Sequence, residues 1–242
     1  MLNIVTALYL EAEPIIKRFN LKRFGEIYQN NHINLIITGS GKIKSAVKTA
    51  LLLQKYPYMT LNFGICGSNY YEIGSGFYIN KITDTDSGYE YYPDFYKENS
   101  REIHTVSKIG KYYRLTDMEA SGFFEACYNF LTVEKIVLFK IVSDTPDNPP
   151  QKKTIREIVN KHINVIENLL EITTERNKNE EIDLIFNEIT SKMKLTKSQQ
   201  AKVKNLITYL YLTNKKIPHI PFLRKKEEVR EFITNLSFLA LS

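Results

Sequence analysis

A continuous apolar run at 135–142 constrains the fold of this chain more than any other segment. It reads Lys-Ile-Val-Leu-Phe-Lys-Ile-Val and ends abruptly in Ser143-Asp144. A run of this length without polar alternation is typical of a strand buried on both faces of a largely parallel sheet. Polar residues just past such a strand lie at the carboxyl edge of the sheet, where open α/β folds keep their ligand sites. Ser143 and Asp144 are therefore candidate site residues.

Apolar strand patterns alternate with helical patterns through the first two thirds of the chain. Strands are expected at 2–8, 26–29, 33–38, 59–65 and 76–82, with helical spacing after residues 9, 43, 123 and 155. The pair Asn30-Asn31 is expected to turn 26–29 back onto 33–38. This alternation predicts an α/β fold with a central, mixed, mostly parallel sheet flanked by helices, closing near residue 173.

The chain changes character after residue 173. Residues 174–242 contain three helical patterns and no strand pattern, after a polar link at 176–179. They hold roughly thirteen Lys and Arg against eight Asp and Glu, most of the net charge of +6. The sequence therefore predicts a first domain at 1–173 and a basic, all-helical C-terminal extension at 174–242, which is either a separate bundle or an arm on the first domain.

Composition argues against several classes of protein. No apolar run of about eighteen residues is present, so no membrane span is expected. The chain enters a strand pattern at once, unlike a signal peptide, and Cys66 and Cys127 lie in apolar surroundings. Reduced cysteines and a cytoplasmic location are expected. The four histidines lack zinc-site spacing, and we expect neither a metal nor a cofactor.

A second polar segment, 115–122, is the other candidate part of a site. It carries Asp117, Met118 and Glu119 just before an apolar helical run. In an α/β sheet, Met118 and Glu119 would lie near Asp144 and supply one apolar surface and two carboxylates to one cleft. Glu11 and a glycine-containing turn at 64–68 follow two other expected strands.

Taken in order, Glu11, the segment 64–68, Met118-Glu119 and Ser143-Asp144 resemble the nucleoside phosphorylase superfamily. The nearest likeness is to its nucleosidase branch, typified by methylthioadenosine/S-adenosylhomocysteine nucleosidases. The resemblance covers about 1–173 and does not reach the extension. It implies the superfamily's fold, a small-molecule nucleoside as substrate and assembly as a homodimer.

The resemblance also implies two catalytic residues. Glu11 would bind and activate the attacking water, with Glu13 as the alternative if the register slips by two. Asp144 would donate a proton toward the imidazole nitrogen of a purine as the glycosidic bond breaks. Ser143 would orient Asp144.

Further matched residues would bind the substrate. Met118 would pack against the sugar, and Glu119 would accept hydrogen bonds from the ribose hydroxyls. Gly64 and Gly67 would form a tight turn whose backbone amides face the ribose. Lys140 stands where relatives often have a hydrogen-bonding arginine. This replacement keeps the positive charge but loses the planar guanidinium that can bind in a bidentate way. A second glycine turn, at 39–41, also matches.

Each of these residues has an ordinary structural role when considered alone. Glu119 would stabilise the start of its helix, and Ser143-Asp144 would cap the turn that follows. Glu11 would be a surface acid and Met118 part of the core. Only their conjunction at the ends of strands indicates a site.

Two departures from the superfamily pattern bear on the reaction and the substrate. Ile65 stands where relatives often place a hydroxyl residue that binds phosphate or water, and only Lys17, Arg18 and Lys42 are candidates to clamp a phosphate. The stretch 84–117 is also short. Only the tyrosine cluster at 89–96 and Tyr112-Tyr113 would replace the missing aromatic base contact, although such tyrosines equally suit a sheet edge or a dimer contact.

The sequence thus predicts a purine nucleosidase, an N-glycosyl hydrolase acting on a purine nucleoside or thio-nucleoside. A phosphate-dependent nucleoside phosphorylase is the first alternative. The second is a non-catalytic protein that binds nucleotides or nucleic acid through the basic extension, which is not favoured because no recognition motif is present.

Overall fold

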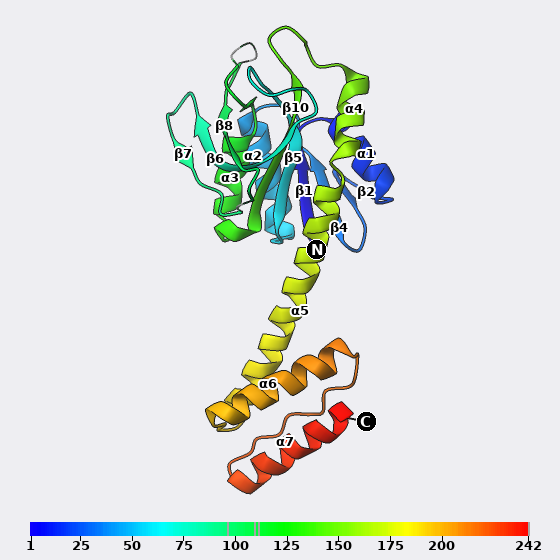
Figure 1. Cartoon of the computed structure of the whole chain (residues 1–242), viewed down its shortest axis with the longest axis vertical. Coiled ribbons are helices and arrows are strands. Elements are labelled where there is room, and N and C mark those ends of the chain that lie inside the picture. Colours follow the sequence, from blue (N-terminus) through cyan, green and yellow to red (C-terminus); the bar gives the residue numbers. More distant parts are fainter. Residues whose placement is uncertain (96, 109, 111, 242) are drawn as a thin grey trace. The chain divides into compact units, whose positions relative to one another are not determined.

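The structure is a computed structural model that describes residues 1–95, 97–108, 110 and 112–241 (Figure 1). The chain divides into two compact units, Met1–Thr173 and Thr174–Ser242. Across the described ranges, no helix combines the length and the apolar character that a membrane crossing requires.

The first unit is built on one mixed sheet. Its strands are β1 (Leu2–Thr6), β2 (Lys22–Phe24), β3 (Ile27–Gln29), β4 (Ile33–Ile37), β5 (Thr60–Gly67), β6 (Gly76–Asp84), β7 (Glu90–Tyr91), β8 (Arg101–Thr105), β9 (Thr116–Asp117) and β10 (Ile136–Asp144). Strands β4, β1, β5 and β10 are parallel neighbours in that order. Strand β6 joins β10 antiparallel, and β8 and β9 lead back from β6 to β5, so five strands close into a ring of pairings.

Strand β10 is apolar from Ile136 to Val142 apart from the buried Lys140, because both of its faces are covered. Its residues alternate between two core clusters: Phe139 and Ile141 pack with Ile158 of one helical layer, and Leu138 and Val142 belong to the other cluster. Successive side chains of a strand point to opposite faces, so a strand between two layers needs apolar residues at every position. The predicted α/β fold with a central mixed sheet and flanking helices is confirmed.

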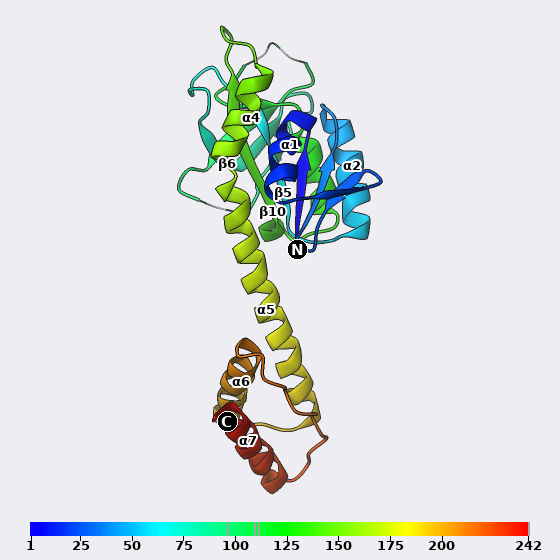
Figure 2. The same ribbon diagram turned by 90° about the vertical axis from the view of Figure 1, so that its right-hand side faces the viewer.

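Helices cover the two faces of the sheet in pairs (Figures 1 and 2). Helix α1 (Tyr9–Arg18) packs with α4 (Lys152–Lys161), and α2 (Lys42–Lys55) packs with α3 (Ala120–Tyr128). A short 3-10 helix, Val133–Lys135, precedes β10. These pairs place the starts of α1, α2 and α3 near the carboxyl ends of β1, β4 and β5.

Two local expectations were wrong. Gly64 and Gly67 lie within β5 and form no turn. The polar segment 176–179, expected to be a link, lies inside α5 (Asn164–Lys192). It contains no Gly or Pro to end a helix, and Lys and Arg are good helix formers. The amphipathic stretch 155–170 is divided near His162 into α4 and α5.

The second unit has a core of its own. Its helices are the end of α5, α6 (Lys197–Leu212) and α7 (Lys226–Leu241). Buried residues from all three, such as Ile189, Val203 and Leu236, form one cluster. Thr196 and Gln199 cap α6 reciprocally and form a capping box.

We expect Gly122→Ala to destabilise the protein because α2 and α3 cross at this glycine. An added Cβ would lie 2.0 Å from the backbone oxygen of Lys42, an atom that cannot move away cheaply. The free energy of unfolding in urea should fall by roughly 1–3 kcal/mol. At a helical position with free space, Gly→Ala would instead raise the free energy of unfolding by about 1 kcal/mol, so the sign of the measured change tests the close contact. Val47→Ala, at an exposed position of α2, is the control and should change little.

Candidate functional site

A cavity of about 300 Å³ opens where β1, β5 and β10 end. The described residues that line it are Ala7, Leu8, Glu11, Ser40, Ile65, Cys66, Gly67, Val106, Gly110, Tyr112, Thr116, Asp117, Met118, Glu119, Asp144, Pro149 and Pro150. Six of the catalytic and substrate-binding residues expected from the sequence therefore meet in this cavity, from α1, β5, β10 and the segment between β9 and α3. Gly64, Ser143 and Lys140 lie behind its wall.

Glu11 is held rigidly in the first turn of α1. Its carboxylate accepts hydrogen bonds from the amides of Ala7 at 2.8 Å, Leu8 at 2.7 Å and Ile65 at 2.9 Å. Gly64 leaves the room for this, because a Cβ there would lie 3.0 Å from the carboxylate. Burial raises the pKa of Glu11 even though these amides and Lys140 oppose the shift. A carboxylate fixed in this way is suited to accept a proton from a bound water.

Asp144 lies across the cavity at the end of β10. It accepts hydrogen bonds from the hydroxyl of Ser143 at 2.5 Å and from the hydroxyl of Tyr112 at 2.9 Å. Gly67 makes this approach possible, since a Cβ there would lie 2.6 Å from the ring of Tyr112. A hydroxyl both donates and accepts, so both partners can stay bonded to Asp144 in either protonation state.

Glu119 stands at the start of α3, but its carboxylate does not cap that helix. It accepts a hydrogen bond from the amide of Gly41 at 2.8 Å, at the start of α2, while Asp117 accepts from the amide of Ala120. Burial, with the nearby charge of Asp117, raises the pKa of Glu119 to about 7. Glu119 therefore faces the cavity with one oxygen anchored.

Lys140 does not line the cavity. Its ammonium pairs with Asp117 at 2.7 Å, and both side chains are almost fully buried. Burial alone would lower the pKa of Lys140, but the charges of Asp117 and Glu119 outweigh it and raise that pKa. Lys140 is thus a buried counter-ion beneath the acids. The sequence analysis missed Asp117 as its partner, although a lysine inside an apolar strand signals the need for one.

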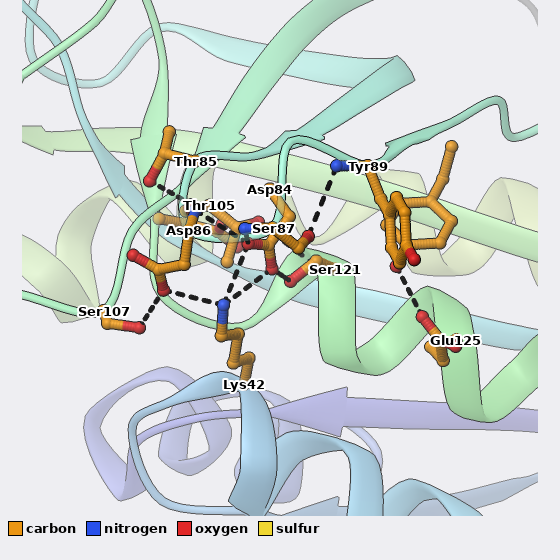
Figure 3. A network of polar contacts seen from close by, with 12 residues as sticks. Lys42, Asp84, Thr85, Asp86, Ser87, Tyr89, Thr105, Ser107, Ser121 and Glu125 are labelled. Carbon is orange, nitrogen blue, oxygen red and sulfur yellow. Dashed lines mark hydrogen bonds and ion pairs between the residues drawn. The ribbon is translucent and has the colours of Figure 1, made fainter.

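A polar network fixes the starts of α2 and α3 to β6 (Figure 3). The ammonium of Lys42 lies 2.8 Å from Asp84 and 2.7 Å from Asp86, and Asp84 also accepts from the hydroxyl of Ser121 at 2.7 Å. Lys42 follows Gly41 directly, so this network positions the amide that anchors Glu119.

The residues proposed from sequence to clamp a phosphate are all engaged elsewhere. Lys42 is in the network just described, Lys17 pairs with Glu13 and Arg18 with Glu167, each at 2.7 Å. Glu13 also pairs with Arg156 and does not line the cavity. Among the described lining residues there is no Lys, Arg or His. The described part of the chain also holds no group of three or more acids, histidines or cysteines arranged for a metal.

The tyrosines considered from sequence divide between two places. Tyr112 lines the cavity and is the only aromatic residue among its described lining. Tyr91 packs against Phe124, and Tyr92 hydrogen-bonds Glu90, away from the cavity. Tyr96 lies outside the described residues.

Comparison with known proteins relates this chain to others by structure alone. No family model matches the sequence, and no curated protein matches it. The structure is similar to 5'-methylthioadenosine nucleosidase from Arabidopsis thaliana, with a TM-score of 0.61 and 15% identity over 71% of this chain and 95% of that one. It is also similar to 5'-methylthioadenosine/S-adenosylhomocysteine nucleosidase from Campylobacter jejuni, with a TM-score of 0.59 and 14% identity over 68% of this chain and 96% of that one. For a futalosine hydrolase mutant from Helicobacter pylori, the TM-score is 0.56 and the identity 12%, over 70% of this chain and 98% of that one.

The superfamily resemblance inferred from the sequence is thus confirmed at the level of the fold. At 12–15% identity these likenesses establish the fold, and the roles of the cavity residues rest on geometry and chemistry.

We expect Glu119→Gln to flatten the dependence of stability on pH. A glutamate in the unfolded chain has a pKa of about 4.3, whereas that of Glu119 in the folded chain is about 7. The folded state binds this proton more tightly, so the stability it contributes is present below the unfolded pKa and is lost as pH rises through about 7. Between about pH 5 and pH 8, the wild type should lose roughly 1–3 kcal/mol more than the variant in urea unfolding.

Glu13→Gln is the matched control for this measurement. The pKa of Glu13 is lowered, chiefly by hydrogen bonds from Lys17 and Arg156, so it titrates below that pH window. Identical pH profiles for Glu119→Gln and the wild type would show that Glu119 is ionised throughout.

Proposed function

We propose that this chain, whose first unit has the fold of nucleosidases, hydrolyses the N-glycosidic bond of a purine nucleoside or thio-nucleoside. The observation that carries the proposal is the convergence of Glu11, Glu119 and Asp144 on one cavity. These acids are up to 133 positions apart in the chain (144 minus 11). Each is anchored by a different set of donors, as a preorganised site requires.

The three carboxylates suit the three tasks of the reaction. Glu119 accepts hydrogen bonds from the ribose hydroxyls and its charge stabilises the positive ribose ring of the transition state. The bond between C1′ and the base nitrogen breaks, its electron pair goes to the base, and Asp144 gives the base a proton. Water attacks C1′ and transfers a proton to Glu11. The products are free base and free sugar.

The charges around the cavity favour water over phosphate as the nucleophile. Phosphate binding needs cations or a cluster of free amides. The described lining instead provides four acids, the three of the proposed mechanism and Asp117. Ile65 adds an apolar side chain and commits its amide to Glu11. Phosphorolysis is therefore the less favoured reaction.

The shape and polarity of the cavity indicate the kind of substrate. Its volume of about 300 Å³ lies at the small end of ligand pockets and suits a single nucleoside. Met118, Val106 and Leu8 give apolar surface that suits a ribose face or a thioether. Tyr112 supplies an aromatic ring beside Asp144. We further propose a homodimer, as the superfamily resemblance implies.

We expect the protein to release free base and free reducing sugar from purine nucleosides at a rate independent of added phosphate. The measurement is a panel of nucleosides and 5'-thio-nucleosides, with and without phosphate, followed by chromatography of base and sugar. Phosphate-dependent turnover with ribose 1-phosphate as product would assign phosphorolysis instead.

We expect Asp144→Asn and Glu11→Gln each to lower kcat by about 10²- to 10⁴-fold, because each removes a proton-transfer group. Glu13→Gln is the matched control: it changes an acid on the same helix that does not reach the cavity, and it should retain wild-type turnover. Wild-type turnover in both Asp144→Asn and Glu11→Gln would refute the mechanism.

A further inference from the structure

A second and larger cavity, of about 550 Å³, lies in the first unit and takes no part in the proposed reaction. It is bounded by β8, by the segment after β5 and by the segment before β9. The residues that line it are Asn69, Tyr70, Tyr71, Arg101, Glu102, His104, Tyr113 and Arg114. None of these residues is among the described lining of the first cavity, the one that contains Glu11, Glu119 and Asp144. The two cavities can therefore be altered independently.

Two arginines of this cavity rest on aromatic rings. The guanidinium carbon of Arg114 lies 4.8 Å from the centre of the Tyr70 ring, and that of Arg101 lies 5.5 Å from the centre of Phe77. Arg101 also donates to the backbone oxygen of Ser100 at 2.8 Å. Within the described residues neither arginine forms an ion pair with a carboxylate. A guanidinium stacked on a ring keeps N–H groups at its edge for a bidentate phosphate contact.

The remaining charges do not cancel these arginines. Glu102, the one acid among the described lining residues, pairs with Lys81 at 3.2 Å and accepts from the hydroxyl of Thr83 at 2.9 Å. Burial lowers the pKa of His104 despite the charge of Glu102, so its ring is neutral at pH 7. Lys81 also pairs with Glu90 at 2.7 Å, so Arg101, Arg114 and Lys81 face two acids and leave an excess of one positive charge at this cavity.

The same cavity presents aromatic surface beside the arginines. Tyr70 is 66% exposed and meets Tyr71 edge to face, with ring centres 4.9 Å apart. The rings of Tyr113 and His104 are stacked at 4.1 Å and 7°. A tyrosine left this exposed in a cavity wall is a platform on which a planar base can stack.

We propose that this cavity binds a nucleotide, with Arg101 and Arg114 on its phosphate and Tyr70 against its base. The volume of about 550 Å³ is within the range for a ligand of that size. The proposal does not rest on the hydrolytic activity, because the described residues of the two linings do not overlap. The cavities are nevertheless adjacent in sequence, since Tyr112 lines the first and Tyr113 and Arg114 line the second.

Calorimetric titration of the full-length protein with AMP, ribose 5-phosphate and inorganic phosphate tests the proposal. AMP should bind, ribose 5-phosphate and phosphate should each bind more weakly because neither carries a base, and AMP affinity should fall as salt is raised. Arg101→Gln and Arg114→Gln should each weaken AMP binding about tenfold or more, because each removes a charge-assisted contact. Tyr70→Leu should weaken AMP binding and leave phosphate binding unchanged.

The matched control is Arg23→Gln. Arg23 also rests on a tyrosine ring, 5.9 Å from the centre of Tyr28, but lies on β2 outside this cavity. Its replacement should leave AMP binding unchanged, and the melting temperature of every variant should confirm that it is folded. Asp144→Asn should keep wild-type AMP binding whatever happens to hydrolysis, which separates a failure here from a failure of the proposed reaction.

Three results would overturn the proposal. The first is no AMP binding at millimolar concentration. The second is AMP binding that Arg101→Gln and Arg114→Gln leave at the level of Arg23→Gln. The third is binding of a single-stranded oligonucleotide that AMP does not displace, which would assign the two arginines to nucleic acid.

Discussion

The buried ion pair between Lys140 and Asp117 is the interaction on which the candidate site depends. It joins the middle of β10 to the short strand β9, at 2.7 Å and out of contact with solvent. Asp117 also accepts from Thr105 and from the amide of Ala120, so the pair sets where α3 begins. Removing one partner of such a pair leaves an uncompensated buried charge, which costs about 3–5 kcal/mol. Glu119 takes its position from this arrangement.

The same pair explains how several acids share one small cavity. Lys140 lowers the cost of ionising both Glu11 and Glu119, while burial raises the pKa of each. The positive charge stays behind the wall, where it balances the acids without offering a nucleophilic anion a place to bind. A cavity of this kind is suited to a cationic transition state. Lys42, which follows Gly41, does not line the cavity and is paired with Asp84 and Asp86.

Part of the site follows from local sequence. The strand ending in Ser143-Asp144 was predictable because a run that is apolar on both faces, here broken only by Lys140, is typical of a strand between two helical layers. Glu11 was singled out because it follows an expected strand, and Glu119 because it precedes an apolar helical run. The glycines of β5 were misjudged as a turn. Their small size serves close approach by Glu11 and by the ring of Tyr112, which is a tertiary requirement.

The sequence by itself indicated the long strands, the helices and the change near residue 173 from mixed patterns to helical patterns alone, because periodicity and end signals are local properties. The short strands β2, β7, β8 and β9 gave no such signal. Only the tertiary structure decided which charges meet. Lys140 stands close to Asp144 in the sequence and Lys42 has no acid nearby in the sequence, yet the first pairs with Asp117 and the second with Asp84 and Asp86. Those partners, and the burial that shifts the pKa of Glu119, depend on the packing of segments far apart in the chain, which no local pattern encodes.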